Sequence, residues 1–197
     1  MSKKKNYNFS YLSSGVNVNL GNKLVKAIKP ITKKINDNNV INGIGGFGAV
    51  YDLNHNNYKR PLLVSATDGV GTKILIAKDM NVFTTIGIDL VAMSVNDLIV
   101  QGAKPLFFLD YIAVEKINKK QILDIIKGIA KGCSQASCSL VGGETAELPG
   151  LYQNSNFDLA GFAVGLVDKN KLLPKKNIKE NDILIGLPSN GIHSNGY

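Results

Sequence analysis

The chain has 197 residues, 44% hydrophobic and 19% charged, which suits one globular domain or slightly more. No stretch is apolar and long enough to span a bilayer, and the residues after Met1 do not resemble a signal-peptide core, so we expect a soluble cytoplasmic protein without a membrane partner. The formal net charge is +8, but Arg60 is the only arginine and the lysines are scattered without aromatic interleaving, which argues against nucleic-acid binding.

Apolar periodicity predicts the secondary structure in chain order. The first twenty residues are polar and lack periodicity, so we expect residues 1–20 to form a flexible arm. Leu24, Ile28, Ile31 and Ile35 then recur at helical spacing, with Pro30 as a kink or early stop, before a glycine-rich loop. The pattern further predicts a strand ending at Thr67, helices over 85–101 and 121–136, and strands over 106–114, 139–141, 157–167 and 182–187.

The order of these elements indicates the fold class. Strand and helix alternate in part, while two strands meet without a helix between them, so we expect an α/β or α+β domain with a mixed sheet and flanking helices. The helix over 85–101 ends at Gly102, a typical C-terminal glycine. Cys133 and Cys138 lie where a helix passes into a strand, and we interpret them as reduced packing residues.

The stretch Asp68-Gly69-Val70-Gly71-Thr72-Lys73 follows a strand directly and could bind a nucleoside triphosphate. Gly69 and Gly71 would let backbone N–H groups face anionic oxygens, Thr72 offers a hydroxyl, Lys73 a point charge, and Asp68 a hard ligand for Mg²⁺. The spacing is not that of a Walker P-loop, and a plain turn explains the same residues equally well at this stage.

Two further acidic segments could join this site. Asp89 shares a helix face with Asn96, and Asp97 is adjacent, although solvated aspartates are the commoner case. A short strand then leads into glycines followed by Glu144, a candidate metal carboxylate, and Glu147, a structural one. Because the carboxyl ends of parallel strands meet at one sheet edge, we expect these groups to approach one another.

The two histidines contribute little by themselves. His55 lies in an asparagine-rich surface loop and receives no role. His193 follows the last predicted strand, where it either caps a turn or contacts a substrate phosphate and moves a proton. Two cysteines and single histidines at these spacings do not make a zinc site.

These segments together resemble one family, the phosphoribosylformylglycinamidine cyclo-ligases, also called aminoimidazole ribonucleotide synthetases. The D-x4-G-A-x-P element that begins at Asp97 resembles an element shared by the wider superfamily, which also contains selenophosphate synthetase and thiamine-monophosphate kinase. The narrower resemblance rests on D-G-V-G-T-K (68–73), G-I-D-L-V-A-M-S-V-N-D-L (87–98), L-F-F-L-D-Y (106–111), G-G-E-T-A-E-L-P-G (142–150) and G-I-H-S-N-G-Y (191–197).

The resemblance implies an ATP-dependent cyclisation of formylglycinamidine ribonucleotide in purine biosynthesis, with ATP and Mg²⁺ as cofactors. It implies Asp68 and Asp97 as Mg²⁺ ligands, with Asp89 and Glu144 as further candidates. The implied nucleotide-binding residues are Gly45, Gly46, Gly48, Asp68, Gly69, Gly71, Thr72, Lys73, Asp97, Gly143 and Glu144. The implied substrate-side residues are His193, Ser194 and Asn195, with His193 and Lys73 as the candidate catalytic residues.

The resemblance also implies a domain division and an oligomeric state. Residues 21–168 would form the ATP-binding and dimerisation domain, and residues 169–197 a linker and the start of a truncated carboxy-terminal domain. Family members pair as homodimers whose strands form a shared barrel, so we expect a homodimer. Two alternatives stay open: an ATP-using sibling that phosphorylates a different acceptor, and a non-catalytic dimerising fragment.

Overall fold

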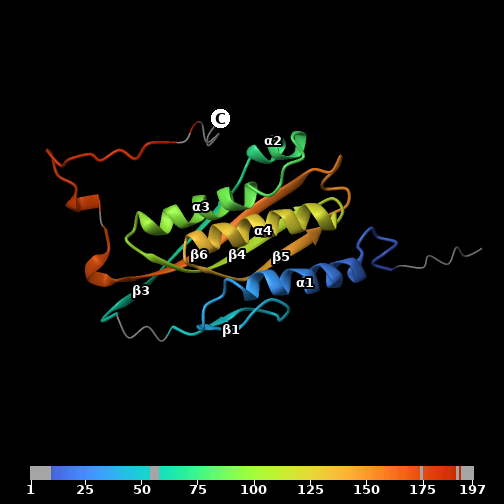
Figure 1. Cartoon of the computed structure of the whole chain (residues 1–197), viewed down its shortest axis with the longest axis horizontal. Helices are drawn as coiled ribbons and strands as arrows, with labels where there is room; N and C mark the ends of the chain where they lie inside the picture. Colours follow the sequence, from blue (N-terminus) through green and yellow to red (C-terminus); the bar gives the residue numbers. More distant parts are fainter. Residues whose placement is uncertain (1–9, 54–57, 174, 190, 192–197) are drawn as a thin grey trace, which may run out of the picture.

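The computed structural model describes residues 10–53, 58–173, 175–189 and 191 (Figure 1). A four-stranded sheet, in the order β3-β6-β4-β5, forms the centre of the fold. In chain order the helices and strands are α1 (Val18–Lys33), β1 (Val40–Asn42), β2 (Val50–Tyr51), β3 (Pro61–Gly69), α2 (Lys73–Asp79), α3 (Ile86–Ile99), β4 (Lys104–Val114), α4 (Lys119–Gln135), β5 (Ser139–Glu147) and β6 (Phe157–Asp168). This mixed sheet with flanking helices confirms the expected fold class at that level.

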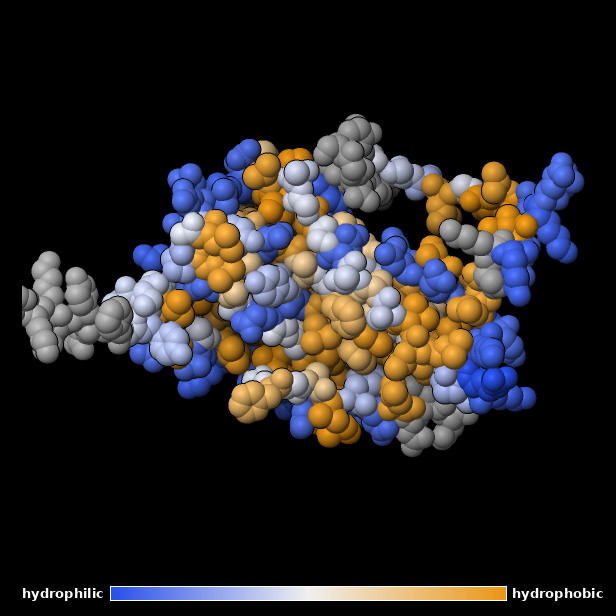
Figure 2. Space-filling model, turned by 180° about the vertical axis from the view of Figure 1, so that it is seen from behind, coloured by the Kyte–Doolittle hydropathy of each residue, from blue (hydrophilic) through white to orange (hydrophobic). Residues whose placement is uncertain are grey.

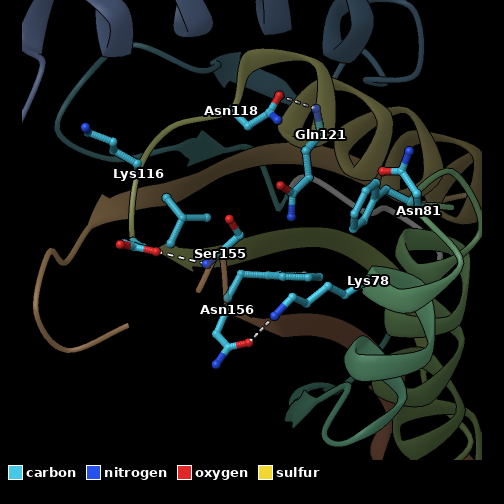
Figure 3. Close-up of a pocket in the computed structure, with 11 residues that line it drawn as sticks. Lys78, Asn81, Lys116, Asn118, Gln121, Ser155 and Asn156 are labelled. Carbon is cyan, nitrogen blue, oxygen red and sulfur yellow. Dashed lines mark hydrogen bonds between the residues drawn. The ribbon is translucent and has the colours of Figure 1, made fainter. Parts of the chain in front are cut away.

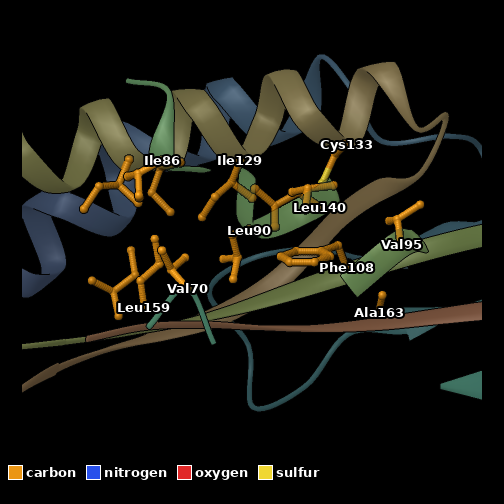
Figure 4. Packing of buried hydrophobic residues seen from close by; sticks show 14 of the residues in the cluster. Val70, Ile86, Leu90, Val95, Phe108, Ile129, Cys133, Leu140, Leu159 and Ala163 are labelled. Carbon is orange, nitrogen blue, oxygen red and sulfur yellow. The ribbon is translucent and has the colours of Figure 1, made fainter. Parts of the chain in front are cut away.

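The hydrophobic core lies between the sheet and the helices α3 and α4 (Figure 4). Alternate residues of β4 point into it, and Phe108 and Ile112 are fully buried there because a strand presents every second side chain to the same face. Helix α3 contributes Leu90 and Leu98, and α4 contributes Ile129, all three fully buried. Side chains that alternate along the strand and side chains that recur about every 3.6 residues along the helices therefore pack into one core.

Glycines allow α3 and α4 to pack with their backbones close together. A Cβ atom on Gly128 would lie 2.5 Å from the carbonyl oxygen of Thr84 and 3.2 Å from Cα of Gly87. Gly132, one turn further along α4, faces Val91 in the same way. A larger side chain at these positions would force the helices apart.

Strands β3, β4 and β5 run in the same direction, with β6 antiparallel between β3 and β4. Their carboxyl ends therefore lie at one edge of the sheet, together with the start of β6. The register places Asp68, Gly161, Asp110 and Gly143 in one row across the four strands. The prediction that the strand ends meet at one edge is confirmed.

The face of the sheet opposite α3 and α4 is largely apolar. Figure 2 shows hydrophobic residues across the middle of the molecule seen from behind. Leu63, Tyr111 and Phe162 project from this face and are 60%, 42% and 42% exposed. Tyr51 of the β1–β2 hairpin packs on Phe107 at a ring centroid distance of 5.1 Å and covers part of it.

Several expected element boundaries were wrong. Helix α1 begins at Val18 and continues through Pro30 to Lys33, so the proline does not stop it. Strand β5 extends from residue 139 to 147 instead of ending at 141, because residues 142–147 pair with β4. Residues 182–187 form no strand in the described chain, and their apolar side chains are almost fully exposed because no neighbouring strand pairs with them there.

Candidate functional site

The glycine-containing stretch after β3 forms the junction between a strand and a helix. Asp68 and Gly69 are the last residues of β3, and the carboxylate of Asp68 accepts a hydrogen bond of 2.8 Å from the N–H of Gly69. Gly71 has a φ of +70°, which favours glycine, and Thr72 precedes the first residue of α2. The sequence predicted the strand end here but missed the short helix α2.

Lys73 and Asp89, which were predicted as a phosphate-binding cation and a metal ligand, contact each other. The ammonium group of Lys73 lies 2.5 Å from Oδ2 of Asp89, and their side chains are 10% and 33% exposed. Lys73 also lies 3.6 Å from the sulfur of Met93. The two charges neutralise each other across α2 and α3, so a phosphate that binds Lys73 must compete with Asp89.

The four candidate metal ligands do not gather in one place. Asp97 is exposed on α3, Asp89 pairs with Lys73, and Glu144 belongs to the far strand β5. Within the described residues, no group of three or more histidine, cysteine, aspartate or glutamate side chains could hold a metal ion. A metal held here therefore needs oxygens from a ligand as well as from the protein.

A cavity of about 370 Å³ does bring several predicted residues together. It lies between α1, the loop before β2, and strands β4 and β5. Gly45 and Gly46 of the loop face Gly143 and Glu144 of β5 across it, whereas Gly48 is not among its lining residues. The rest of the lining consists of Val16, Asn17, Val18, Gly21, Asn22, Leu24, Val25, Ile28, Ile44, Asp110, Ile117, Ile126 and Thr145.

Asp110 forms part of this cavity and was not predicted from the sequence. Its side chain is only 7% exposed and occupies the core-facing row of β4 between two fully buried apolar residues. The pKa of Asp110 is raised from 3.8 to about 7, mainly because burial disfavours its charged form. A hydrogen bond from its own backbone N–H lowers this pKa, and the nearby charge of Glu144 contributes to the rise. The alternation along Leu106–Val114 was the available signal, since it places Asp110 on the buried face.

Glu147 has the structural role that the sequence indicated. Its carboxylate accepts hydrogen bonds from the backbone N–H of Asn17, at 2.7 Å, and from that of Ile117, at 2.9 Å. Asn17 in turn caps α1, because its side chain accepts from the N–H of Leu20 at 3.0 Å. Glu147 thus fixes the start of α1 beside the cavity.

A separate polar cavity of about 290 Å³ lies at the same sheet edge (Figure 3). Lys78 donates to the amide oxygen of Asn156 at 2.7 Å, and the backbone N–H of Ser155 donates to Glu115 at 2.9 Å. These residues were not predicted from the sequence, since no motif marks them. The substrate-side residues His193, Ser194 and Asn195 lie outside the described residues, as does His55.

These features define an α/β domain with a glycine-lined cavity at one edge of its sheet. No helix in the described residues has the length and apolar character needed to cross a membrane. The family model described as "AIR synthase related protein, N-terminal domain" matches residues 45–167. The chain belongs to this family.

Among curated proteins, the chain is similar to phosphoribosylformylglycinamidine cyclo-ligases. It is 58% identical over 188 residues to that of Thermoanaerobacter pseudethanolicus, which covers 95% of this chain and 55% of the relative. It is 55% identical over 188 residues to that of Chromobacterium violaceum, covering 95% of this chain and 54% of the relative. The chain thus spans about half the length of these relatives.

Among solved structures, the fold is similar to thiamine-monophosphate kinase from Stenotrophomonas maltophilia K279a, with a TM-score of 0.56 and 21% identity over 76% of this chain and 43% of that chain. It is also similar to hydrogenase maturation protein HypE in complex with ATP, with a TM-score of 0.54 and 18% identity over 82% of this chain and 44% of that chain. At these identities the comparison supports the fold alone.

Proposed function

We propose that this chain serves the ATP-dependent cyclisation of formylglycinamidine ribonucleotide to aminoimidazole ribonucleotide, with release of ADP and phosphate, in purine biosynthesis. The observation that carries the proposal is the 58% identity to a cyclo-ligase over 95% of the chain. A protein of this role acts in the cytoplasm, and we propose that location.

The chemistry requires positioning and charge neutralisation rather than a covalent enzyme intermediate. The formyl amide oxygen attacks the γ-phosphorus of ATP and ADP leaves, which converts a poor leaving oxygen into a phosphate ester. The amidine nitrogen then attacks the formyl carbon that carries this phosphate, the ring closes, and phosphate and a proton are released. Glycine-lined cavities and carboxylates suit these steps, because they hold phosphates and cations in fixed places.

The glycine-lined cavity supports a nucleotide site. Gly45, Gly46 and Gly143 leave their backbones open to it, and Glu144 supplies a carboxylate. We propose that the remaining nucleotide contacts come from Gly48 in the same loop and from the Asp68–Lys73 stretch. His193, Ser194 and Asn195 remain the proposed substrate-side residues.

The donor set of the cavity fits Mg²⁺ bound together with phosphate oxygens. Two carboxyl groups, those of Asp110 and Glu144, line it, and Mg²⁺ in proteins commonly uses one or two carboxylates plus ligand phosphates. When bound, the metal would supply charge neutralisation at the phosphates. Asp68, Asp97 and Asp89 do not line this cavity, so we retain them as proposed Mg²⁺ ligands outside it, and the ion pair of Asp89 with Lys73 must open for that role.

We also propose that residues 21–168 form the dimerisation domain and that two copies pair through the apolar face of the sheet. Leu63 and Phe162 on that face are 60% and 42% exposed, which supports burial against a partner. Sedimentation of a Leu63→Asp, Phe162→Asp variant should give monomers. The matched control Leu151→Asp, which alters a residue 74% exposed in a loop, should leave the dimer intact.

ADP release by this chain with Mg-ATP, with and without formylglycinamidine ribonucleotide, tests the proposed activity. Stimulation by this substrate is the expected result. Stimulation by a different acceptor would instead favour the superfamily sibling, and dimerisation without any ATP use would favour the non-catalytic fragment. The same assay on a chain extended beyond Tyr197 separates a missing domain from a wrong substrate.

Asp68→Asn tests the proposed role of the Asp68–Lys73 stretch in the same assay. We expect ADP formation to be lost while the dimer stays intact, because the carboxylate is proposed to act on the nucleotide. An unfolded or dissociated variant would show that Asp68 is structural, as its hydrogen bond to Gly69 allows.

A further inference from the structure

The turn between α4 and β5 joins the two cysteines of the chain, which the proposed reaction does not use. Cys133 lies in the last turn of α4, and Cys138 directly precedes the first residue of β5. Both belong to the hydrophobic core, where they are 0% and 4% exposed, and Figure 4 shows the side chain of Cys133 pointing from α4 toward the sheet. Three of the four residues between them are exposed, so the pair lies directly beneath a surface turn.

Two backbone hydrogen bonds hold the cysteines close to each other. The N–H of Cys138 donates to the carbonyl oxygen of Cys133 at 2.9 Å, and the N–H of Ser137 donates to that of Ser134 at 3.2 Å. Ser137 has a φ of +53°, the left-handed conformation that ends a helix with this pair of bonds, a Schellman motif. The motif commonly brings into contact the side chains of the two residues joined by its longer bond. In this chain both of those residues are cysteines.

The distance and the facing of the two thiols meet the requirements of a disulfide bond. The 2.9 Å hydrogen bond, extended by the covalent bonds on each side, keeps the two Cα atoms within about 7 Å of each other, the limit for a disulfide without backbone movement. The side chains also interact: a hydrogen bond from the thiol of Cys133 to Cys138, together with burial, raises the pKa of Cys133. The same hydrogen bond lowers the pKa of Cys138.

We propose that Cys133 and Cys138 are a redox modification site, at which the folded chain forms a reversible disulfide by exchange with a small disulfide such as oxidised glutathione. The thiolate of Cys138 attacks one sulfur of glutathione disulfide, whose S–S bond breaks and releases one glutathione thiolate, which takes up the proton of Cys133. Cys133 then attacks the sulfur of Cys138 and releases the second glutathione. Two cysteine thiols are oxidised, and one glutathione disulfide is reduced to two thiols.

The disulfide would join the end of α4 to the start of β5 across their connecting turn. Strand β5 carries Gly143 and Glu144 to the glycine-lined cavity, so the turn lies at the other end of a strand that forms part of the candidate site. The reduced pair allows the turn to open, whereas the disulfide would hold it closed. This role does not depend on the proposed reaction, because it rests on the geometry of the turn alone.

Equilibration of the full chain with mixtures of reduced and oxidised glutathione tests the site. Because the chain has no other cysteine, mass spectrometry after thiol labelling gives the oxidised fraction directly, as a species that lacks both thiols and is lighter by two hydrogens. We expect the folded chain to be half oxidised at a ratio [GSH]²/[GSSG] at least about tenfold higher than the chain unfolded in urea, because the native turn already holds the two thiols together. Dithiothreitol should restore both thiols.

Three results would overturn the proposal. A folded chain that keeps both thiols, or that is half oxidised at a lower ratio than the unfolded chain, would show that the native geometry opposes the bond. Disulfides between two chains in place of the internal one would show that the cysteines do not pair with each other. Cys133→Ala and Cys138→Ala are the matched controls: each should bind at most one glutathione and give no species lighter by two hydrogens. The comparison of folded with unfolded wild-type chain needs neither variant, so it stands even if both fail to fold.

Discussion

The close packing of α3 on α4 leads to a prediction in which one substitution has opposite effects at two helix positions. Gly128→Ala adds a methyl group on α4 that would lie 2.5 Å from the carbonyl oxygen of Thr84, where ordinary van der Waals contact begins at 3.4 Å. Gly21→Ala adds the same group on α1, where nothing lies within 4 Å. Only the first substitution requires backbone to move.

The expected magnitudes follow from two terms. Alanine is favoured over glycine within a helix by about 1 kcal/mol, which applies at both positions. At Gly128 the overlap with backbone costs about 3 kcal/mol, the upper end of the usual range for overpacking, since no flexible side chain can yield. We therefore expect Gly128→Ala to lower the free energy of unfolding by about 2 kcal/mol and Gly21→Ala to raise it by about 1 kcal/mol.

Urea unfolding followed by circular dichroism measures both changes. In thermal unfolding, the same values correspond to a midpoint about 4–8 °C lower for Gly128→Ala and about 2–4 °C higher for Gly21→Ala, for a chain of this size. A Gly128→Ala variant that is as stable as the wild-type chain would show that α3 and α4 are further apart than described. The argument from close backbone contact would then be refuted.

Three further predictions concern charged groups. Because the folded Asp110 has a pKa of about 7, it keeps a proton that the unfolded chain releases near 3.8, so the free energy of unfolding should fall by about 3 kcal/mol from pH 5 to pH 8. Asp110→Asn should remove that contribution in urea titrations, and an unchanged slope contradicts it. Glu147→Ala should lower the free energy of unfolding by about 1–3 kcal/mol and speed hydrogen exchange of the two backbone N–H groups that donate to its carboxylate. Unaltered exchange would rule out this structural role of Glu147. A double-mutant cycle of Lys73→Met with Asp89→Asn should give a coupling energy of about 1 kcal/mol, and a value of zero would deny their ion pair.

Local sequence patterns were sufficient for the long elements of this fold. Helix α3 follows from apolar residues at helical spacing, and it ends at Ile99, two residues before the predicted end. Gly102, at a φ of +83°, takes the conformation that closes the following turn. Strands β4 and β6 follow from long apolar runs, and both extend only one or two residues beyond their predicted ends. In these segments, local preference and tertiary packing favour the same conformation.

The candidate site could be predicted only in part. The sequence indicated Gly45, Gly46, Gly143 and Glu144 as separate motifs, and the structure places all four around one cavity. It did not indicate that Lys73 would pair with Asp89, because partners 16 positions apart on two helices leave no local signal. The substrate-side roles of His193, Ser194 and Asn195 remain predictions.

By itself, the sequence determined the type of the long elements, the mixed α/β class and the family, because periodicity and motif residues are local properties of the chain. Tertiary structure alone decided two features. Pairing with β4 holds residues 142–147 in an extended strand that their own composition does not favour. The register of β4 and β5 puts the Asp110 carboxyl group beside Gly143. The burial of this group depends on which strands and helices pack together there, and these contacts join residues far apart in the sequence.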